Sequence, residues 1–206
     1  MNSPDLKNQE TRPKTKAEDT REVFKMVFVG KPGTGKTTVL RKILHDGLSS
    51  GRRALIVTPH ENEWEDVPMV HPRFPERIRR YRGARRLICH GEKEILENIK
   101  RNFVNGFLIF DDCKAYIRPS DRVYMEQFLL ALRQKDVDFA CCGHGFTTIP
   151  PVFYTFATEF VIFATTDNPR KRKDDVMNFE EVEKAVNRVN QKALRDKHYY
   201  EIIKNQ

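Results

Sequence analysis

Short apolar runs alternate with amphipathic segments along most of the chain. Five apolar runs have the length of buried strands, at residues 24–29, 54–57, 107–110, 137–142 and 160–164. Three segments place apolar side chains at helical spacing, at residues 36–48, 121–133 and about 178–195. Apolar strands that alternate with amphipathic helices predict an α/β fold, a three-layer α/β/α sandwich whose mostly parallel central sheet is covered on both faces.

Two segments fall outside this alternation. Residues 1–22 are rich in Lys, Glu, Asp, Thr and Pro and have almost no large apolar side chain, which predicts a flexible polar arm. Residues 23–206 have the size of one domain, with its core in residues 24–165. Residues 59–86 show little periodicity and are too long for a plain connector, which predicts a functional segment or one that a partner orders in part.

The composition is that of a folded, basic protein. With 37 Lys and Arg against 29 Asp and Glu, the formal net charge is +8, which favours a polyanionic partner such as nucleic acid, or an acidic membrane surface. No run reaches the roughly 18 apolar residues that cross a bilayer, and the first twenty residues lack the apolar region of a secretory signal. We therefore expect no transmembrane segment and a cytoplasmic location.

The cysteines carry no signature of a metal site or of a disulfide framework. Cys89, Cys113, Cys141 and Cys142 include no CxxC pair and lie in apolar segments, which predicts buried, reduced thiols. Successive side chains of a strand point to opposite faces, so the adjacent Cys141 and Cys142 should face opposite sides of the sheet.

A phosphate-binding motif follows the first apolar run. Residues 30–37 match G-x-x-x-x-G-K-[ST] and lie between a predicted strand and a predicted helix, the context that this motif requires. Backbone N–H groups of such a loop converge on phosphate oxygens at the helix N-terminus. Lys36 would reach the β and γ phosphates, and Thr37 would offer its hydroxyl to Mg²⁺. The predicted nucleotide-binding residues are Gly30, Lys31, Pro32, Gly33, Thr34, Gly35, Lys36, Thr37 and Thr38.

Two acids, Asp111 and Asp112, follow the apolar run at residues 107–110. Ligands bind beyond the carboxyl ends of the strands in an open α/β sheet, so these carboxylates should lie beside the bound phosphates. Asp111 is the predicted partner of Mg²⁺, through water, and Asp112 is the predicted base or water-positioning residue of phosphoryl transfer. The structural alternative is a turn or capping pair, because Asp is common after strands.

Two further residues are candidates for a place near the γ phosphate. His144 lies between two glycines after the run at residues 137–142, either as a sensor of hydrolysis or as a histidine that satisfies a backbone carbonyl in a turn. Arg133 ends the preceding predicted helix, where a cation suits the helix dipole. In a ring of subunits it would instead reach a neighbour's nucleotide and stabilise transition-state charge.

The order of these features resembles the FtsK/HerA superfamily of P-loop ATPases, and within it the genome-packaging ATPases of viruses and phages. The features are the phosphate-binding loop, the paired acids, Arg133 before the fourth strand and polar His144 after it. Family members usually have glutamine in place of His144 and often glutamate in place of Asp112. The resemblance implies the P-loop NTPase form of the sandwich, ATP and Mg²⁺ as cofactors, and a homo-oligomeric ring that couples ATP hydrolysis to DNA movement in the host cytoplasm or on the virion.

A second stretch carries the same resemblance. Residues 55–64 look like the Asp-Pro-His-Gly-Glu-aromatic stretch that follows the second strand of HerA-type proteins. Thr58 stands where that stretch has aspartate, so the resemblance implies no catalytic role there. The packaging relatives also imply a docking partner, a capsid vertex or a membrane-associated virion protein.

Basic clusters agree with a DNA substrate. Six arginines crowd one short segment together with Tyr81, namely Arg77, Arg79, Arg80, Arg82, Arg85 and Arg86. Cationic loops bind phosphate backbones without reading sequence, and an aromatic residue among the cations suits stacking on a base. Residues 170–173 form a second basic cluster. The alternative for each cluster is a solvated surface run.

Three other functions stay open on these residues. The chain also resembles the zonula occludens toxin-like assembly ATPases of filamentous phages, which usually continue into a membrane span that this sequence lacks. A small-molecule kinase would need a lid over its acceptor, and the segment after Pro59 is a candidate lid. A scaffold protein would bind ATP to hold its shape and hydrolyse none.

Overall fold

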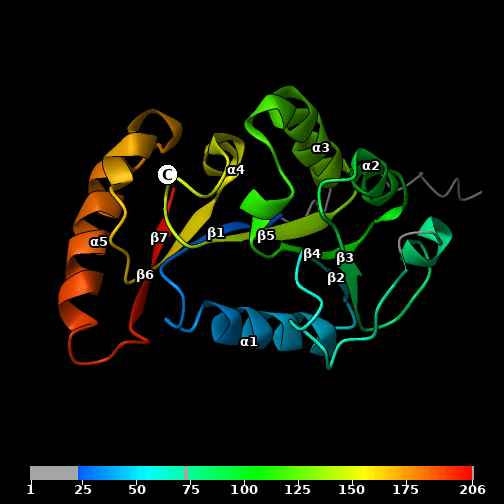
Figure 1. Cartoon of the computed structure of the whole chain (residues 1–206), viewed down its shortest axis with the longest axis horizontal. Coiled ribbons are helices and arrows are strands. Elements are labelled where there is room, and N and C mark those ends of the chain that lie inside the picture. Colours follow the sequence, from blue (N-terminus) through cyan, green and yellow to red (C-terminus); the bar gives the residue numbers. More distant parts are fainter. Residues whose placement is uncertain (1–22, 72–73, 206) are drawn as a thin grey trace, which may run out of the picture.

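The computed structural model describes residues 23–71 and 74–205, and the predicted arm at 1–22 lies outside the described residues. Its centre is a seven-stranded sheet with the order β3-β2-β4-β5-β1-β6-β7 (Figure 1). The strands are β1 (Lys25–Val29), β2 (Arg53–Thr58), β3 (Ala84–Ile88), β4 (Gly106–Phe110), β5 (Val137–Gly143), β6 (Glu159–Phe163) and β7 (Tyr200–Lys204). Neighbouring strands are parallel except β6 and β7, which are antiparallel.

Helices cover both faces of the sheet (Figure 1). The α-helices are α1 (Lys36–Ser49), α2 (Lys93–Asn102), α3 (Arg122–Gln134), α4 (Pro151–Phe156) and α5 (Phe179–Lys192). On one face Leu40 of α1 packs in a core with Phe28 of β1. The other four helices contribute to the core on the opposite face through Leu96, Leu129, Phe153 and Val186. The predicted three-layer α/β/α sandwich is confirmed.

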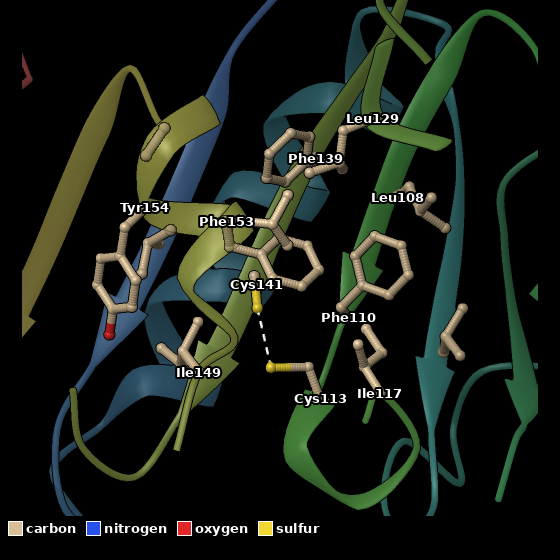
Figure 2. Close-up of a cluster of buried hydrophobic side chains, with 14 of the residues drawn as sticks. Leu108, Phe110, Cys113, Ile117, Leu129, Phe139, Cys141, Ile149, Phe153 and Tyr154 are labelled. Atoms are coloured by element: carbon tan, nitrogen blue, oxygen red, sulfur yellow. Dashed lines mark hydrogen bonds between the residues drawn. The ribbon is translucent and has the colours of Figure 1, made fainter. Parts of the chain in front are cut away.

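The middle strands are mostly apolar because both of their faces are covered, and Asp138 of β5 is a buried exception. Cys141 of β5 belongs to the core beneath α2 to α5, and the adjacent Cys142 belongs to the core beneath α1, as predicted. The Cys141 thiol donates a hydrogen bond to the sulfur of Cys113, at 3.0 Å, in a cluster that also holds Phe110 and Phe153 (Figure 2). The four cysteines are buried free thiols.

The structure contains elements that the pattern did not predict: β3, β7, α2 and α4. The strands β3, Ala-Arg-Arg-Leu-Ile, and β7, Tyr-Glu-Ile-Ile-Lys, lie at the two edges of the sheet, where polar side chains interrupt the apolar run. The run at 160–164, the last of the predicted strands, is followed by β7, which pairs with β6. Residues 170–173, expected as a loop, lie in a 3₁₀ helix, η4 (Pro169–Asp175). Within the described residues no helix is both long and apolar enough to cross a membrane.

The parallel strands bring distant polar segments to one edge of the sheet. Residues 30–35 leave β1 there, residues 59–64 leave β2, residues 111–112 leave β4 and residues 144–145 leave β5. The antiparallel β7 begins at this edge, since Tyr200 pairs with Phe163, the last residue of β6. This carboxyl edge is where open α/β sheets bind ligands.

Candidate functional site

The glycine-rich motif forms the turn from β1 into α1. The Gly30 N–H donates to the carbonyl of Gly143 at 3.3 Å, and the Lys31 N–H donates to that of Ala164 at 2.9 Å. These bonds fix the loop to the ends of β5 and β6. Glycine is required at the first position by space, because a Cβ on Gly30 would lie 2.5 Å from the Cβ of Phe163.

The end of the loop leaves three N–H groups ahead of the first helical hydrogen bond. Gly35 has a φ of +95° in the left-handed region, where a glycine is favoured, and it caps α1. The first helical bond runs from the Val39 N–H to the Gly35 carbonyl, at 3.1 Å. The N–H groups of Lys36, Thr37 and Thr38 therefore precede the helical ladder and suit an anion.

Lys36 is buried, with 9% of its surface exposed. Its Nζ donates to the carbonyl oxygens of Gly30 at 2.6 Å and Lys31 at 3.1 Å, so the loop encloses its ammonium group. Burial lowers the pKa of Lys36, while negative groups that include Asp111 and Asp112 oppose that shift. Lys36 is thus bound to the loop carbonyls and lines the same pocket as the paired acids.

Asp111 is also buried, with 8% of its surface exposed, and its partner comes from the segment after β2. The indole N–H of Trp64 donates to Asp111 Oδ2 at 2.7 Å. The Asp111 N–H donates to the Val57 carbonyl at 2.9 Å, which continues the β2–β4 pairing past the end of the strand. One carboxylate oxygen is therefore fixed by a buried donor, and the residue still lines the pocket described below.

Trp64 has an unusual backbone conformation for a bulky residue, a φ of +59°. A non-glycine residue in this region costs on the order of 1–3 kcal/mol, so the surroundings must hold it. Its side chain is 2% exposed in the core beneath α1, and the Arg41 guanidinium lies 4.4 Å from its ring centroid. Arg41 is itself fixed by two bonds to Asp66, at 2.6 and 2.8 Å. These contacts stabilise the strained turn that delivers the indole to Asp111.

Asp112 lies between two histidines. Its Oδ2 is 3.2 Å from His60 Nε2, and its Oδ1 is 4.0 Å from His144 Nε2. Asp112 has a φ of +45°, which aspartate tolerates better than most residues, and its side chain is partly exposed. Glu63 lies on the same side, and desolvation together with the Asp111 carboxylate raises the pKa of Glu63. Carboxylates and imidazoles from β2, β4 and β5 therefore meet at one place.

These groups line a single pocket of about 410 Å³ at the carboxyl edge. Its lining is Pro32, Gly33, Gly35, Lys36, Thr37, Thr38, His60, Glu63, Asp111, Asp112, His144 and His198. The remaining predicted loop residues do not line the pocket. The Gly30 carbonyl accepts a hydrogen bond from Lys36, and Lys31 is exposed. The buried Thr34 hydroxyl donates to the Lys31 carbonyl at 2.8 Å. Arg133 lies outside the pocket, exposed in the last turn of α3.

No protein-family model and no curated protein matches the sequence. Among solved structures, the genome packaging NTPase B204 from Sulfolobus turreted icosahedral virus 2 in complex with AMP has a TM-score of 0.72 and 12% identity, over 89% of this chain and 93% of that chain. The same NTPase in complex with AMPPCP has a TM-score of 0.70 and 12% identity, over the same 89% and 93%.

A third structure is B204, the DNA-packaging ATPase from Sulfolobus Turreted Icosahedral Virus, with a TM-score of 0.68 and 12% identity over 87% of this chain and 91% of that chain. This chain has the P-loop NTPase fold. The loop at residues 30–37 stands at the place in that fold, between a strand and a helix, that the motif requires.

The arginines predicted to bind DNA lie outside the pocket of this P-loop NTPase fold. Arg77, Arg79, Arg80 and Arg82 are exposed. Arg85 and Arg86 are not in a loop as expected, because they belong to β3. The Arg86 guanidinium donates to the carbonyls of Glu61 and Glu63, so it holds the segment that carries His60 and Trp64.

Tyr81, the aromatic residue expected to suit stacking on a base, is half-buried among the arginines. Its hydroxyl donates to the Ala54 carbonyl at 2.8 Å, and its ring packs against the core. The guanidinium groups of Arg53 and Arg85 lie 5.2 and 5.3 Å from the ring centroid. Burial raises the pKa of Tyr81. Tyr81 therefore anchors the basic segment to β2.

Four residues of the site were given no role from the sequence: His60, Glu63 and the buried Trp64 after β2, and His198 before β7. The first three share a signal that could have found them, because a polar segment directly after a buried strand reaches the ligand edge of a parallel sheet. His198 gave no such signal, since its position depends on β7, and β7 was not predicted.

Proposed function

We propose that the chain is a Mg²⁺-dependent ATPase that moves DNA, a viral or phage genome-packaging motor of the FtsK/HerA type. The observation that carries the proposal is the convergence of Lys36, Asp111 and Asp112 on one pocket at the carboxyl edge of a P-loop NTPase fold. Phosphoryl transfer needs a cationic phosphate cradle, a carboxylate for the metal and a group that orients the attacking water. This pocket holds a candidate for each.

The residues of the pocket fit Mg²⁺. Magnesium takes oxygen ligands, usually one or two from the protein, with phosphates and waters as the others. Thr37 and Asp111 would hold the ion, and within the described residues no group of three or more His, Cys, Asp or Glu forms a metal site of its own. When bound, the ion would neutralise charge on the β and γ phosphates. Thr37 is exposed, and Asp111 is held in place by the indole of Trp64. Both residues line the pocket, so the Thr37 hydroxyl and the Asp111 carboxylate are the oxygen ligands that it offers.

Asp112 would orient the attacking water and accept its proton. Its neighbours support this role, since His60 and His144 bracket the carboxylate from β2 and β5. A carboxylate that is partly exposed and flanked by imidazoles keeps room for a water at the γ phosphate. His144 would report the loss of that phosphate through Asp112, and Lys36 would bind the β and γ phosphates.

DNA movement is proposed from two observations. The solved structures with the same fold include a genome packaging NTPase and a DNA-packaging ATPase, and the formal net charge of this chain is +8. The test is phosphate release from Mg·ATP with and without duplex DNA over a range of salt. We expect duplex DNA to raise turnover and salt to weaken that effect, because cations on the motor displace counterions from DNA phosphates. A rate that DNA leaves unchanged at every salt concentration would refute the motor and leave a plain ATPase.

In a ring of subunits, a neighbouring chain would supply a cation to stabilise the transition-state charge in the pocket. None of the residues that line the pocket in the described part of the chain is an arginine, and transition-state charge in P-loop ATPases is commonly stabilised by one. Arg133 is exposed at the end of α3 and is the proposed donor to a neighbouring subunit.

A mixing experiment tests this arrangement. Lys36→Ala subunits keep Arg133, and Arg133→Ala subunits keep the phosphate loop, so a mixed ring contains some complete sites. We expect the mixture to hydrolyse ATP faster than either variant alone. A rate equal to the mean of the two would place the arginine role elsewhere. Native mass measurement of the same samples gives the ring size.

The contacts of residues 59–64 favour hydrolysis over a small-molecule kinase. A kinase lid must move, but Trp64 is buried and Arg86 binds the carbonyls of Glu61 and Glu63.

The proposed setting is the host cytoplasm or the virion, with a capsid vertex or a membrane-associated virion protein as docking partner.

A further inference from the structure

His198 lies far from the phosphate loop in the sequence and next to it in space. It precedes β7, whose first residue, Tyr200, pairs with Phe163 at the end of β6. β6 in turn pairs with β1, and the loop leaves β1 at the same edge. The imidazole packs against the loop, because a Cβ on Gly35 would lie 3.1 Å from His198 Nδ1.

The segment that carries His198 is held at both ends. The His198 and Tyr199 N–H groups donate to Asp196, each at 3.0 Å. The Tyr199 hydroxyl accepts from Lys192 at 2.7 Å and donates to Glu201 at 3.1 Å. The ring of Tyr200 stacks on Phe163 with centroids 5.1 Å apart. His198 is thus an exposed side chain on a fixed support.

The strand order places His198 and the acids on opposite sides of the loop. In the order β4-β5-β1-β6-β7, Asp111 and Asp112 follow β4 and His144 follows β5, whereas His198 precedes β7. All of them line the same pocket. If the acids face the metal and the γ phosphate, the rest of the nucleotide extends across Gly35 toward β7.

We propose that His198 stacks on the base of the bound nucleotide and closes the nucleoside end of the pocket. The inference rests on the proposed function, since it takes the γ phosphate to lie at the acids. An imidazole offers a flat face to a base, and its packing against Gly35 sets where that face lies. A Cβ at position 35 would crowd the ring, so this glycine serves both the turn and the contact.

Calorimetric titration of the full chain with two probes tests the inference. The probes are ATP and inorganic tripolyphosphate, each with Mg²⁺, and tripolyphosphate carries the charge of the phosphate chain without a base. We expect His198→Ala to weaken ATP binding about tenfold, the scale of one aromatic–base contact, and to leave tripolyphosphate binding unchanged. His198→Phe keeps a flat ring and should retain ATP affinity. His45→Ala, which removes an exposed histidine on α1, should bind both probes like the unmodified chain.

The outcomes separate this inference from the function beneath it. Equal losses for ATP and tripolyphosphate, with no rescue by His198→Phe, would make His198 a phosphate contact and overturn base stacking. Unchanged binding of both probes by His198→Ala would also overturn it, while the ATPase stands. An unmodified chain that binds neither probe would remove the proposed function and this inference together.

Discussion

The carboxyl edge of the sheet, where the parallel strands end, and the amino edge, where they begin, carry charge in different ways. At the carboxyl edge Lys36 and Asp111 are buried, and each has a defined partner within one pocket. At the amino edge the exposed Arg79 and Arg82 line an open pocket of about 880 Å³ together with Arg53. Burying a charge is costly unless it is matched by specific bonds, whereas exposed cations attract polyanions through the field they share. The first edge suits one ligand geometry, and the second suits a density of negative charge.

The cations of the amino edge divide further into structural and exposed groups. Arg53 donates to the carbonyls of Val104, Ile78 and Arg79, and Arg52 binds Asp138 and the Gly106 carbonyl. These two arginines tie loops to the sheet. Under the proposed function, the exposed arginines beside them are the candidates for contact with DNA phosphates. Substitutions should therefore cause specific losses at the carboxyl edge, each at one step of binding or hydrolysis, and small, salt-dependent losses at the amino edge.

The largest effect is expected from Lys36→Ala. Removing the buried ammonium takes away the charge that faces the β and γ phosphates, and we expect ATP hydrolysis to fall by about 10³-fold, to the background of the assay. Phosphate release at saturating Mg·ATP measures it. Lys42→Ala removes the same charge from the exposed surface of α1 and should hydrolyse ATP at the native rate. Unchanged turnover in Lys36→Ala would exclude the loop from the reaction.

Asp112→Asn should separate binding from hydrolysis. The amide cannot accept the proton of the attacking water, so we expect turnover to fall by about 10²-fold while ATP affinity stays within a few-fold of native. Equilibrium binding and phosphate release on the same preparation give both numbers. Asp174→Asn, an exposed acid in η4, is the matched control. Hydrolysis at the native rate would show that another group positions the water.

The chemistry of the loop and the acids could be predicted from sequence because it is local. Residues 30–37 and Asp111 directly follow apolar strands, and a parallel sheet gathers such positions at one edge whatever the rest of the chain does. The middle strands were predictable for the same reason, since burial on both faces leaves a continuous apolar run. The fold class therefore needed little more than the order of these runs.

The support of the site depended on contacts that no local pattern encodes. Trp64 reaches Asp111 across 47 positions in the chain, and Arg86 fixes Glu61 from the neighbouring strand. The sequence did not predict the role of Arg86 because Arg85 and Arg86 are typical of a solvated loop, whereas both lie in the edge strand β3. His198 required β7, an edge strand with alternating polar residues. The roles of Trp64, Arg86 and His198 therefore depend on the strand topology, which local sequence patterns do not contain.

Trp64→Phe tests the support of the carboxyl edge with a smaller expected loss. The ring stays buried, but Asp111 loses its indole donor, and a hydrogen bond to a charged group contributes about 1.5–3 kcal/mol. We expect the Mg²⁺ concentration for half-maximal hydrolysis to rise about tenfold and the melting temperature to fall. Mg²⁺ titration of phosphate release measures the first effect and thermal denaturation the second. A lower melting temperature with an unchanged Mg²⁺ dependence would reduce Trp64 to a core residue.

The smallest effect is expected at the amino edge, from the double variant Arg79→Ala/Arg82→Ala. Each exposed arginine that contacts a DNA phosphate contributes a salt slope of about 0.9, so the slope of log K against log salt should become shallower by about 1.8. DNA affinity should fall only a few-fold at moderate salt, and hydrolysis without DNA should not change, because both side chains lie outside the nucleotide pocket. The control is Lys42→Ala/Lys184→Ala, which removes two exposed charges from α1 and α5, outside both basic clusters. If both double variants lose DNA affinity equally and have equally shallow salt slopes, DNA binding depends on the net charge alone. The amino edge would then have no special part in DNA binding, and the contrast between the two edges would not hold.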